Sequence, residues 1–186
     1  MSLPIFASLM EIVINHIETQ RLKLINCNLQ ILNVIFEGNQ ALANALQISV
    51  SDNWATFGEQ PFRYTDNKLK DFPEDAIWWT YLILHKKNNT LIGSCGYKGK
   101  PDENGMIELG YEIKVAYRNK GLATEAAKAL IENAFKNENV KIASAHTLAE
   151  ENASVKVLRK CGLQFVDEIF DKEDGNLWFW KLNKLV

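Results

Sequence analysis

Residues 113–127, IKVAYRNKGLATEAA, combine cationic, small and hydroxyl side chains in a pattern that suits the binding of a phosphate group. The start of a helix leaves about four backbone N–H groups without partners, and the helix dipole adds partial positive charge there. Gly121 has no Cβ, so an anion can approach the backbone closely, and Ala123 keeps a neighbouring position small. Three further side chains add charge or a hydroxyl: Arg118, Lys120 and Thr124. The segment therefore predicts a pyrophosphate cradle formed by the backbone around Gly121.

This segment matches neither of two common phosphate-binding loops. A Walker loop ends in Gly-Lys-Ser/Thr, which is missing here, and the spacing is not Gly-x-Gly-x-x-Gly either. From the spacing alone a plainer interpretation stays open, in which Gly121 only ends a loop and Arg118 is a solvated charge.

Two carboxylates precede the cradle on a segment that predicts a strand, 106–115 (MIELGYEIKV). Glu108 and Glu112 are an even number of residues apart, so they point to the same face of that strand, with Gly110 between them. A carboxylate within reach of an amine can accept its proton, directly or through water. Both are candidate bases, although a solvated side chain or one bonded to loop backbone fits the same spacing.

The rest of the chain predicts the elements that position these residues. Apolar and β-branched runs predict strands over 21–26, 77–85, 91–97, 106–115, 141–148, 163–170 and 176–182. Helical periodicity predicts helices over 29–47, part of 51–72, 122–138 and 153–160. Trp78 and Trp79 then fall on opposite faces of one strand. This order predicts an α+β fold with a mostly antiparallel sheet, and not a doubly wound α/β fold.

Composition is that of an ordinary globular protein. Of 186 residues, 47% are apolar and 24% charged, and no repeat or linker divides them, so we expect one domain over 18–186 after an N-terminal extension, 1–17. The net charge of −2 argues against bulk binding to nucleic acid or to an anionic membrane. The three cysteines lack Cys-x-x-Cys spacing, so neither disulfides nor a metal site is expected.

The apolar N-terminal segment does not read as a signal peptide. It lacks a basic region, because the first basic residue is Arg21, and no run in the chain approaches the length of a membrane span. A cytoplasmic location is the default expectation.

Arg118-x-x-Gly121-x-Ala123, between a strand and an alanine-rich helix, resembles the CoA-binding signature of the GNAT acetyltransferase superfamily, Gln/Arg-x-x-Gly-x-Gly/Ala. Other segments resemble that superfamily in the expected order. ETQRLKL (18–24) resembles the opening strand of its ribosomal-protein N-terminal acetyltransferase branch. LIGSCGY and IELGYEI resemble the paired strands before the cradle, and NASVKVLRKCGLQFV resembles a later helix and strand. The similarity covers most of 18–182 and favours the cradle over the plainer interpretation.

The resemblance implies a specific cofactor site. A GNAT sheet splays between its fourth and fifth strands, here 106–115 and 141–148, with helices on both faces. The pantetheine of acetyl-CoA lies in that wedge, where backbone groups of Ile113 and Val115 would meet it. N–H groups of the cradle would bind the pyrophosphate: Arg118, Asn119, Lys120, Gly121, Leu122, Ala123 and Thr124. Lys156 and Arg159 are candidates for the 3′-phosphate, or are plain exposed charges.

The resemblance also suggests which residues handle protons. The family often places a base at the position of Glu108, which makes Glu108 the first candidate and Glu112 the second. Many relatives carry a tyrosine on the later helix as proton donor, where this chain has Leu158. Ser154 matches a serine of the ribosomal-protein branch that can contact cofactor or thiolate. The usual Asn-x-x-Ser spacing is shortened here, so Asn152 is either a cofactor contact or only the N-cap of its helix.

The resemblance implies an N-acetyltransferase that moves acetyl from acetyl-CoA to a primary amine in a ternary complex, without a metal. The amine is a protein N-terminus or a small molecule, the 51–72 region is the family's usual place for substrate contacts, and a homodimer is compatible with these expectations. Two alternatives stay open: an acyl-CoA-binding sensor or carrier without efficient catalysis, and a nucleotide-binding protein that uses the same cradle.

Overall fold

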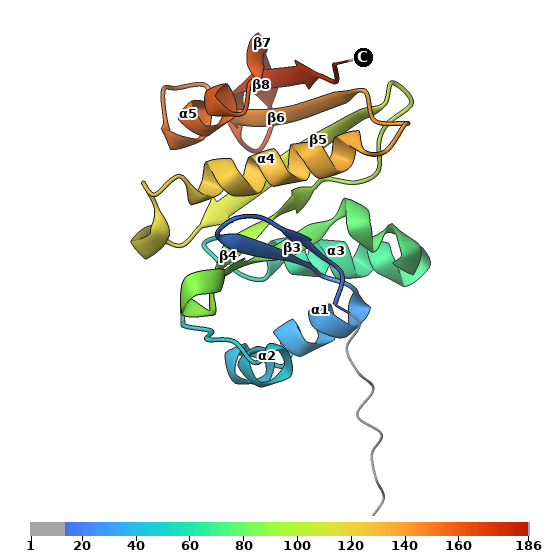
Figure 1. Cartoon of the computed structure of the whole chain (residues 1–186). Coiled ribbons are helices and arrows are strands. Elements are labelled where there is room, and N and C mark those ends of the chain that lie inside the picture. Colours follow the sequence, from blue (N-terminus) through green and yellow to red (C-terminus); the bar gives the residue numbers. More distant parts are fainter. Residues whose placement is uncertain (1–13, 186) are drawn as a thin grey trace, which may run out of the picture.

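A computed structural model describes residues 14–185, and within that range the chain forms one eight-stranded sheet with helices on both faces (Figure 1). The strands follow the order β1-β2-β3-β4-β5-β6-β8-β7. Their bounds are β1 (His16–Glu18), β2 (Leu22–Asn26), β3 (Thr80–His85), β4 (Thr90–Tyr97), β5 (Met106–Ile113), β6 (Ile142–Leu148), β7 (Gln164–Asp171) and β8 (Gly175–Asn183). All neighbours pair antiparallel except β5 and β6, which pair parallel. The predicted α+β fold is confirmed.

The sheet opens between β5 and β6, which are the fourth and fifth of the predicted strands. These strands pair only from Met106 opposite Ile142 to Glu108 opposite Ser144. A hydrogen bond from the buried Ser144 Oγ to the carbonyl of Ile107, 2.9 Å long, joins them at this point. Beyond it each strand continues while bonded only to its outer neighbour, β4 or β8. The predicted splay is therefore confirmed, and it leaves two inward-facing strand edges.

Five α-helices lie on the two faces of the sheet in the described range. They are α1 (Leu29–Phe36), α2 (Asn39–Leu46), α3 (Gln60–Asp71), α4 (Leu122–Phe135) and α5 (Ala153–Lys160). Helices α4 and α5 share one apolar core with the sheet, and α1, α2 and α3 share a second core on the other face. Figure 1 shows α4 crossing the sheet near its middle, with α1 and α2 at the end of the molecule opposite β7 and β8. This arrangement brings the start of α4 next to the splay.

The structure corrects several predicted elements. The helix predicted over 29–47 is two helices, because Gly38 precedes α2 with a φ of 107° that breaks the first helix. Trp78 and Trp79 do not share a strand: Trp78 ends a 3₁₀ turn, η1 (Pro73–Trp78), and β3 begins after Trp79. The strand predicted over 106–115 ends at Ile113, and the chain then turns through η3 (Val115–Tyr117). A third 3₁₀ turn, η2 (Lys86–Asn88), joins β3 to β4.

Most of the predicted extension, 1–17, lies outside the described residues. Its last part is described, and His16 and Ile17 belong to β1, which pairs with β2. None of the helices in residues 14–185 has the length and apolar character that crossing a membrane requires.

Candidate active site

The start of α4 presents free backbone amides, as the sequence predicts. Gly121 is the N-cap and adopts a left-handed conformation with a φ of 76°. The first helical hydrogen bond runs from the amide of Glu125 to the carbonyl of Gly121, over 3.1 Å. The amides of Leu122, Ala123 and Thr124 precede that bond and have no helical acceptor. Together with the helix dipole they provide a local positive potential in a chain whose net charge is −2.

Thr19 and Arg21, together called the strap, hold this loop through hydrogen bonds to Glu125 and Lys120. The Glu125 carboxylate accepts hydrogen bonds from the Thr19 hydroxyl at 2.6 Å, the Arg21 amide at 2.7 Å and Arg21 Nε at 2.6 Å. Arg21 Nη1 also donates to the carbonyl of Lys120 at 2.8 Å. Partial burial raises the pKa of Glu125, but the bonds from Thr19 and Arg21 outweigh it, so the pKa lies below its ordinary value. The strap holds the loop in the conformation that aims its amides outward.

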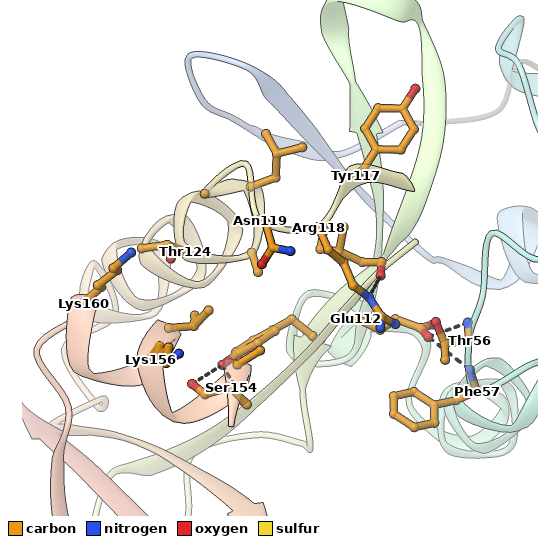
Figure 2. A pocket seen from close by; sticks show the side chains of 17 residues that line it. Thr56, Phe57, Glu112, Tyr117, Arg118, Asn119, Thr124, Ser154, Lys156 and Lys160 are labelled. Atoms are coloured by element: carbon orange, nitrogen blue, oxygen red, sulfur yellow. Dashed lines mark hydrogen bonds between the residues drawn. The ribbon is translucent and has the colours of Figure 1, made fainter. Parts of the chain in front are cut away.

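These amides open into a pocket of about 560 Å³ that lies between the start of α4, the start of α5 and the end of β5 (Figure 2). Nine residues predicted for the site line it: Glu112, Ile113, Arg118, Asn119, Gly121, Leu122, Ala123, Thr124 and Ser154. Lys156, a candidate for the 3′-phosphate, lines it too. Five lining residues were not predicted: Tyr111, Tyr117, Ala153, Val157 and Lys160. Two more, Thr56 and Phe57, lie in the 51–72 region that was expected to contact substrate. The pocket therefore contains most of the segment predicted to form the cradle, together with residues of α5 and of a loop before α3.

Cations surround the cradle. Arg118 donates from Nε to the carbonyl of Ile113 at 2.8 Å, which ties the loop to the end of β5. Lys156 and Lys160 line the pocket from α5, and both side chains are exposed (Figure 2). Guanidinium and ammonium groups next to unpaired amides favour an anion with several oxygens.

A hydroxyl pair lies in the pocket where β5 faces α5. The Tyr111 hydroxyl is 2.8 Å from Ser154 Oγ, and either oxygen can donate (Figure 2). Burial raises the pKa of Tyr111 to about 12. Leu158, which stands where many GNAT relatives have a tyrosine, is fully buried. Tyr111 and Ser154 thus form a hydrogen-bonded hydroxyl pair in the pocket lining, which also includes Thr56, Tyr117 and Thr124.

Glu112 holds a loop in place at the other end of the pocket. Its carboxylate accepts hydrogen bonds from the Thr56 amide at 2.6 Å and the Phe57 amide at 3.0 Å (Figure 2). The Ser94 hydroxyl also donates to it at 2.7 Å. The residue is only 7% exposed. This geometry matches the alternative in which the carboxylate is bonded to loop backbone. Glu112 thus brings Thr56 and Phe57 to the pocket wall.

Glu108 lies away from the pocket lining. Its carboxylate forms an ion pair with Lys98 and lies 3.0 Å from Nδ1 of His146, on the strand next to β5. The contact between Glu108 and His146 places the two side chains on one face of the splayed sheet. The histidine was not predicted for the site.

Three other predicted residues also do not line the pocket. Val115 lies in η3, past the end of β5, and is 71% exposed. Lys120 turns back, so that its ammonium donates to the carbonyl of Ala116 and lies over the Tyr117 ring. Asn152 is the N-cap of α5, where its side chain accepts from the amide of Val155 at 3.0 Å.

Arg159, the second candidate for the 3′-phosphate, is engaged elsewhere. Its guanidinium pairs with Glu151 through two hydrogen bonds of 2.6 and 2.9 Å and lies over the Trp180 ring. No cluster of three or more His, Cys, Asp or Glu side chains within residues 14–185 is arranged to hold a metal ion.

Known proteins resemble this chain in sequence and in fold. Residues 41–164 match the model of the GNAT acetyltransferase domain. The chain is 29% identical over 153 residues to YjdG, an uncharacterised N-acetyltransferase of Bacillus subtilis, and the match covers 78% of this chain and 88% of that protein.

Two solved structures share the fold. One is the ribosomal L7/L12 α-N-protein acetyltransferase RimL in complex with coenzyme A, with a TM-score of 0.67, 14% identity, and coverage of 91% of this chain and 98% of the other. The second is a chimera of spermidine N-acetyltransferase from Vibrio cholerae, with a TM-score of 0.63, 16% identity, and coverage of 88% and 96%. With a family match that spans most of its length, this chain belongs to the GNAT acetyltransferase family.

Proposed function

We propose that this protein transfers the acetyl group of acetyl-CoA to a primary amine by direct attack in a ternary complex. The observation that carries the proposal is the continuity of three features: unpaired amides at the start of α4, a pocket beside them, and a sheet that opens between β5 and β6. A diphosphate with a long, narrow, amide-containing arm fits that combination. Acetyl-CoA has both parts.

The residues present fit this cosubstrate. The amides of Leu122, Ala123 and Thr124 would bind the diphosphate bridge, and Gly121 allows it to approach the backbone. Arg118, Lys156 and Lys160 would supply the neutralising charge. A role for Asn119 is supported by its place in the pocket lining. The free edge of β5 up to Ile113 would bond the pantetheine amides as an added strand does.

For Lys120, Val115 and Asn152 we propose contacts through the backbone only. Each could still contribute through its backbone N–H or C=O, but their side chains are engaged or directed away from the pocket. For Ile113 we propose the backbone contact with pantetheine, and for Gly121 the close approach of the diphosphate.

The reaction requires three events at the thioester. The amine must lose a proton, its nitrogen must attack the carbonyl carbon, and the sulfur must leave with the electron pair of the C–S bond. Tyr111 and Ser154 lie on the side of β5 that packs toward α5, where their hydroxyls would meet the sulfur. Glu108 lies on the opposite face of β5, where an amine would approach. The two faces thus separate the leaving group from the nucleophile.

The acceptor is proposed only as a primary amine. RimL is named for a protein N-terminus and the Vibrio cholerae enzyme for spermidine. The net charge of −2 favours a cationic amine of either class.

The experiment is a thiol-release assay with acetyl-CoA and two probe amines, spermidine and a short peptide with a free N-terminus, after calorimetric titration with acetyl-CoA. Arg118→Ala should weaken acetyl-CoA binding about tenfold, the loss of one charge-assisted contact, while Arg159→Ala should leave it unchanged. Tight binding without thiol release from any amine would favour the sensor or carrier alternative. Stabilisation by ATP and not by CoA would refute the proposal.

A further inference from the structure

A histidine and a carboxylate form a pair at the point where the splayed strands rejoin. His146 lies on β6, two residues beyond Ser144, the last residue that pairs with β5. That spacing is about 7 Å along the strand. An arm that enters the wedge from the α4 end cannot pass Glu108 and Ser144, because β5 and β6 are bonded to each other there. The deepest point that the reactive end of the arm can reach is therefore beside this pair.

The face of the sheet next to the pair is open. Gly110 lies between Glu108 and Glu112 on that face, and a Cβ placed on Gly110 would have no atom within 4 Å. Any side chain larger than hydrogen at position 110 would occupy this space. Because Gly110 has no side chain, there is room for an amine between Glu108 and Glu112 on this face of β5.

The contacts of Glu108 fix which nitrogen of His146 carries a proton. One carboxylate oxygen, Oε1, receives the Lys98 ammonium and lies 3.0 Å from His146 Nδ1. A carboxylate paired with an ammonium accepts hydrogen bonds, so Nδ1 must donate. The neutral ring then carries its lone pair on Nε2. The ring stacks on Phe179 at 4.7 Å with an interplanar angle of 12°, which restrains its rotation.

We infer that His146, oriented by Glu108, accepts the proton of the acceptor amine, an inference that rests on the proposed function. Nε2 takes one proton from the ammonium and passes it to solvent, and the nitrogen lone pair then forms the C–N bond at the thioester carbon. The C–S bond breaks with its electrons on sulfur, and the second proton of the nitrogen ends on the thiol. Glu108 is then a positioning residue, because its Oε1 binds both the Lys98 ammonium and His146 Nδ1 and so holds the ring with its lone pair on Nε2.

The kinetic test compares His146→Gln with wild type using acetyl-CoA and the two probe amines. The value of kcat/KM for the amine should fall about 100-fold, the size expected for loss of a general base, while the acetyl-CoA KM stays within about twofold. His16→Gln is the matched control, because His16 lies on the distant edge strand β1. Glu108→Gln should lower kcat by a smaller factor than His146→Gln. Retention of wild-type kcat/KM by His146→Gln would overturn the inference.

A pH profile separates the base from the amine. If His146 is the base, kcat/KM should decrease at low pH, at the same pH for both amines, and this acid limb should be absent in His146→Gln. A limb caused by protonation of the amine should instead occur at a pH that differs between the two amines. Charged groups that face the ring are Glu108 from β5, Lys98 before it, Asp171 from β7 and Lys181, whose ammonium lies over Phe179. Their variants should move the limb without removing it. An acid limb that survives in His146→Gln would contradict the assignment.

A spectroscopic test does not depend on turnover. Long-range ¹H–¹⁵N spectra report the tautomer of each histidine, and His146→Gln identifies the signal. We expect the Nδ1–H tautomer and a change in the ring signals when acetyl-CoA is added. If no amine releases thiol, the proposed function fails, and these two observations still decide the geometry. An Nε2–H tautomer, or ring signals that ignore acetyl-CoA, would refute the placement of His146.

Discussion

Replacing Gly121 with alanine tests the cradle most directly. Gly121 has a φ of 76°, a left-handed conformation that costs an alanine about 1–2 kcal/mol. The added Cβ would lie 3.5 Å from Arg21 Nη2, an ordinary contact, so no steric clash adds to that cost. For a chain of this length 1 kcal/mol corresponds to about 2–4 °C, so Tm should fall by about 2–8 °C.

The effect on ligand binding should exceed this conformational cost. To relieve the strain the loop must change its dihedral angles, which turns the amides that follow Gly121 away from a bound diphosphate. Loss of one hydrogen bond to a charged group costs about 1.5–3 kcal/mol, so the acetyl-CoA Kd should rise by about 10- to 100-fold. Isothermal titration calorimetry measures this Kd, and thermal unfolding measures the stability.

Gly175 provides a matched control for the strain. It lies at the start of β8 with a φ of 78°, and a Cβ there would meet nothing within 4 Å. Gly175→Ala should therefore lose a similar amount of stability while acetyl-CoA affinity stays unchanged. If Gly121→Ala is destabilised like Gly175→Ala but binds acetyl-CoA as wild type does, the diphosphate does not depend on this turn and the cradle assignment is wrong.

Three further changes test the supports of the site. Glu125→Gln should lower the unfolding free energy by about 1–2 kcal/mol, because it weakens the bonds from Thr19 and Arg21, and denaturant titrations measure the loss. Because folding lowers the pKa of Glu125, this contribution is present above about pH 4.3, the ordinary value, and should disappear as the pH falls further. Tyr111→Phe should reduce kcat about tenfold in the thiol-release assay without changing the acetyl-CoA Kd, because it removes only the hydroxyl that we propose meets the sulfur. Glu112→Gln should speed limited proteolysis near Phe57, because the neutral amide oxygen of glutamine accepts the two loop N–H bonds less strongly than the carboxylate Oε2 does.

The outcomes that contradict these expectations are distinct. Glu132→Gln changes an exposed glutamate on the same helix and serves as the control. If Glu125→Gln lowers the unfolding free energy no more than Glu132→Gln does, the bonds from Thr19 and Arg21 do not stabilise the fold. A Tyr111→Phe variant with altered acetyl-CoA Kd and normal kcat would make Tyr111 a binding residue instead. Unchanged cleavage near Phe57 in Glu112→Gln would show that other contacts hold that loop.

Local features of the site could be predicted from the sequence. The turn at Gly121 and the amides after it follow from residue types at short spacing, since helix starts and left-handed turns depend on neighbouring residues. Tyr111 was missed although a signal existed. It alternates with Glu112 on β5, so the same alternation that placed the two glutamates on one face places Tyr111 on the other, toward α5.

Other features depend on contacts between distant segments, which sequence spacing does not encode. Thr56 and Phe57 reach the pocket only because their amides bond to Glu112, more than 50 residues later. The pairing of Glu108 with His146 depends on the register between β5 and β6. Trp78 was wrongly placed on a strand because its aromatic neighbours have high strand propensity, whereas Pro73 starts a 3₁₀ turn that ends at Trp78.

The short seam between β5 and β6 is where the two parts of the sheet pair with each other. Three residue pairs, with the Ser144 hydroxyl bonded across them, join the part made of β1–β5 to the part made of β6–β8. A small rotation of one part about this seam would displace the far ends of β5 and β6, at the mouth of the wedge beside α4, by a larger distance. A change of side-chain volume at Ile107 or Ala143, both buried at the seam, is therefore expected to change the width of an opening several residues away.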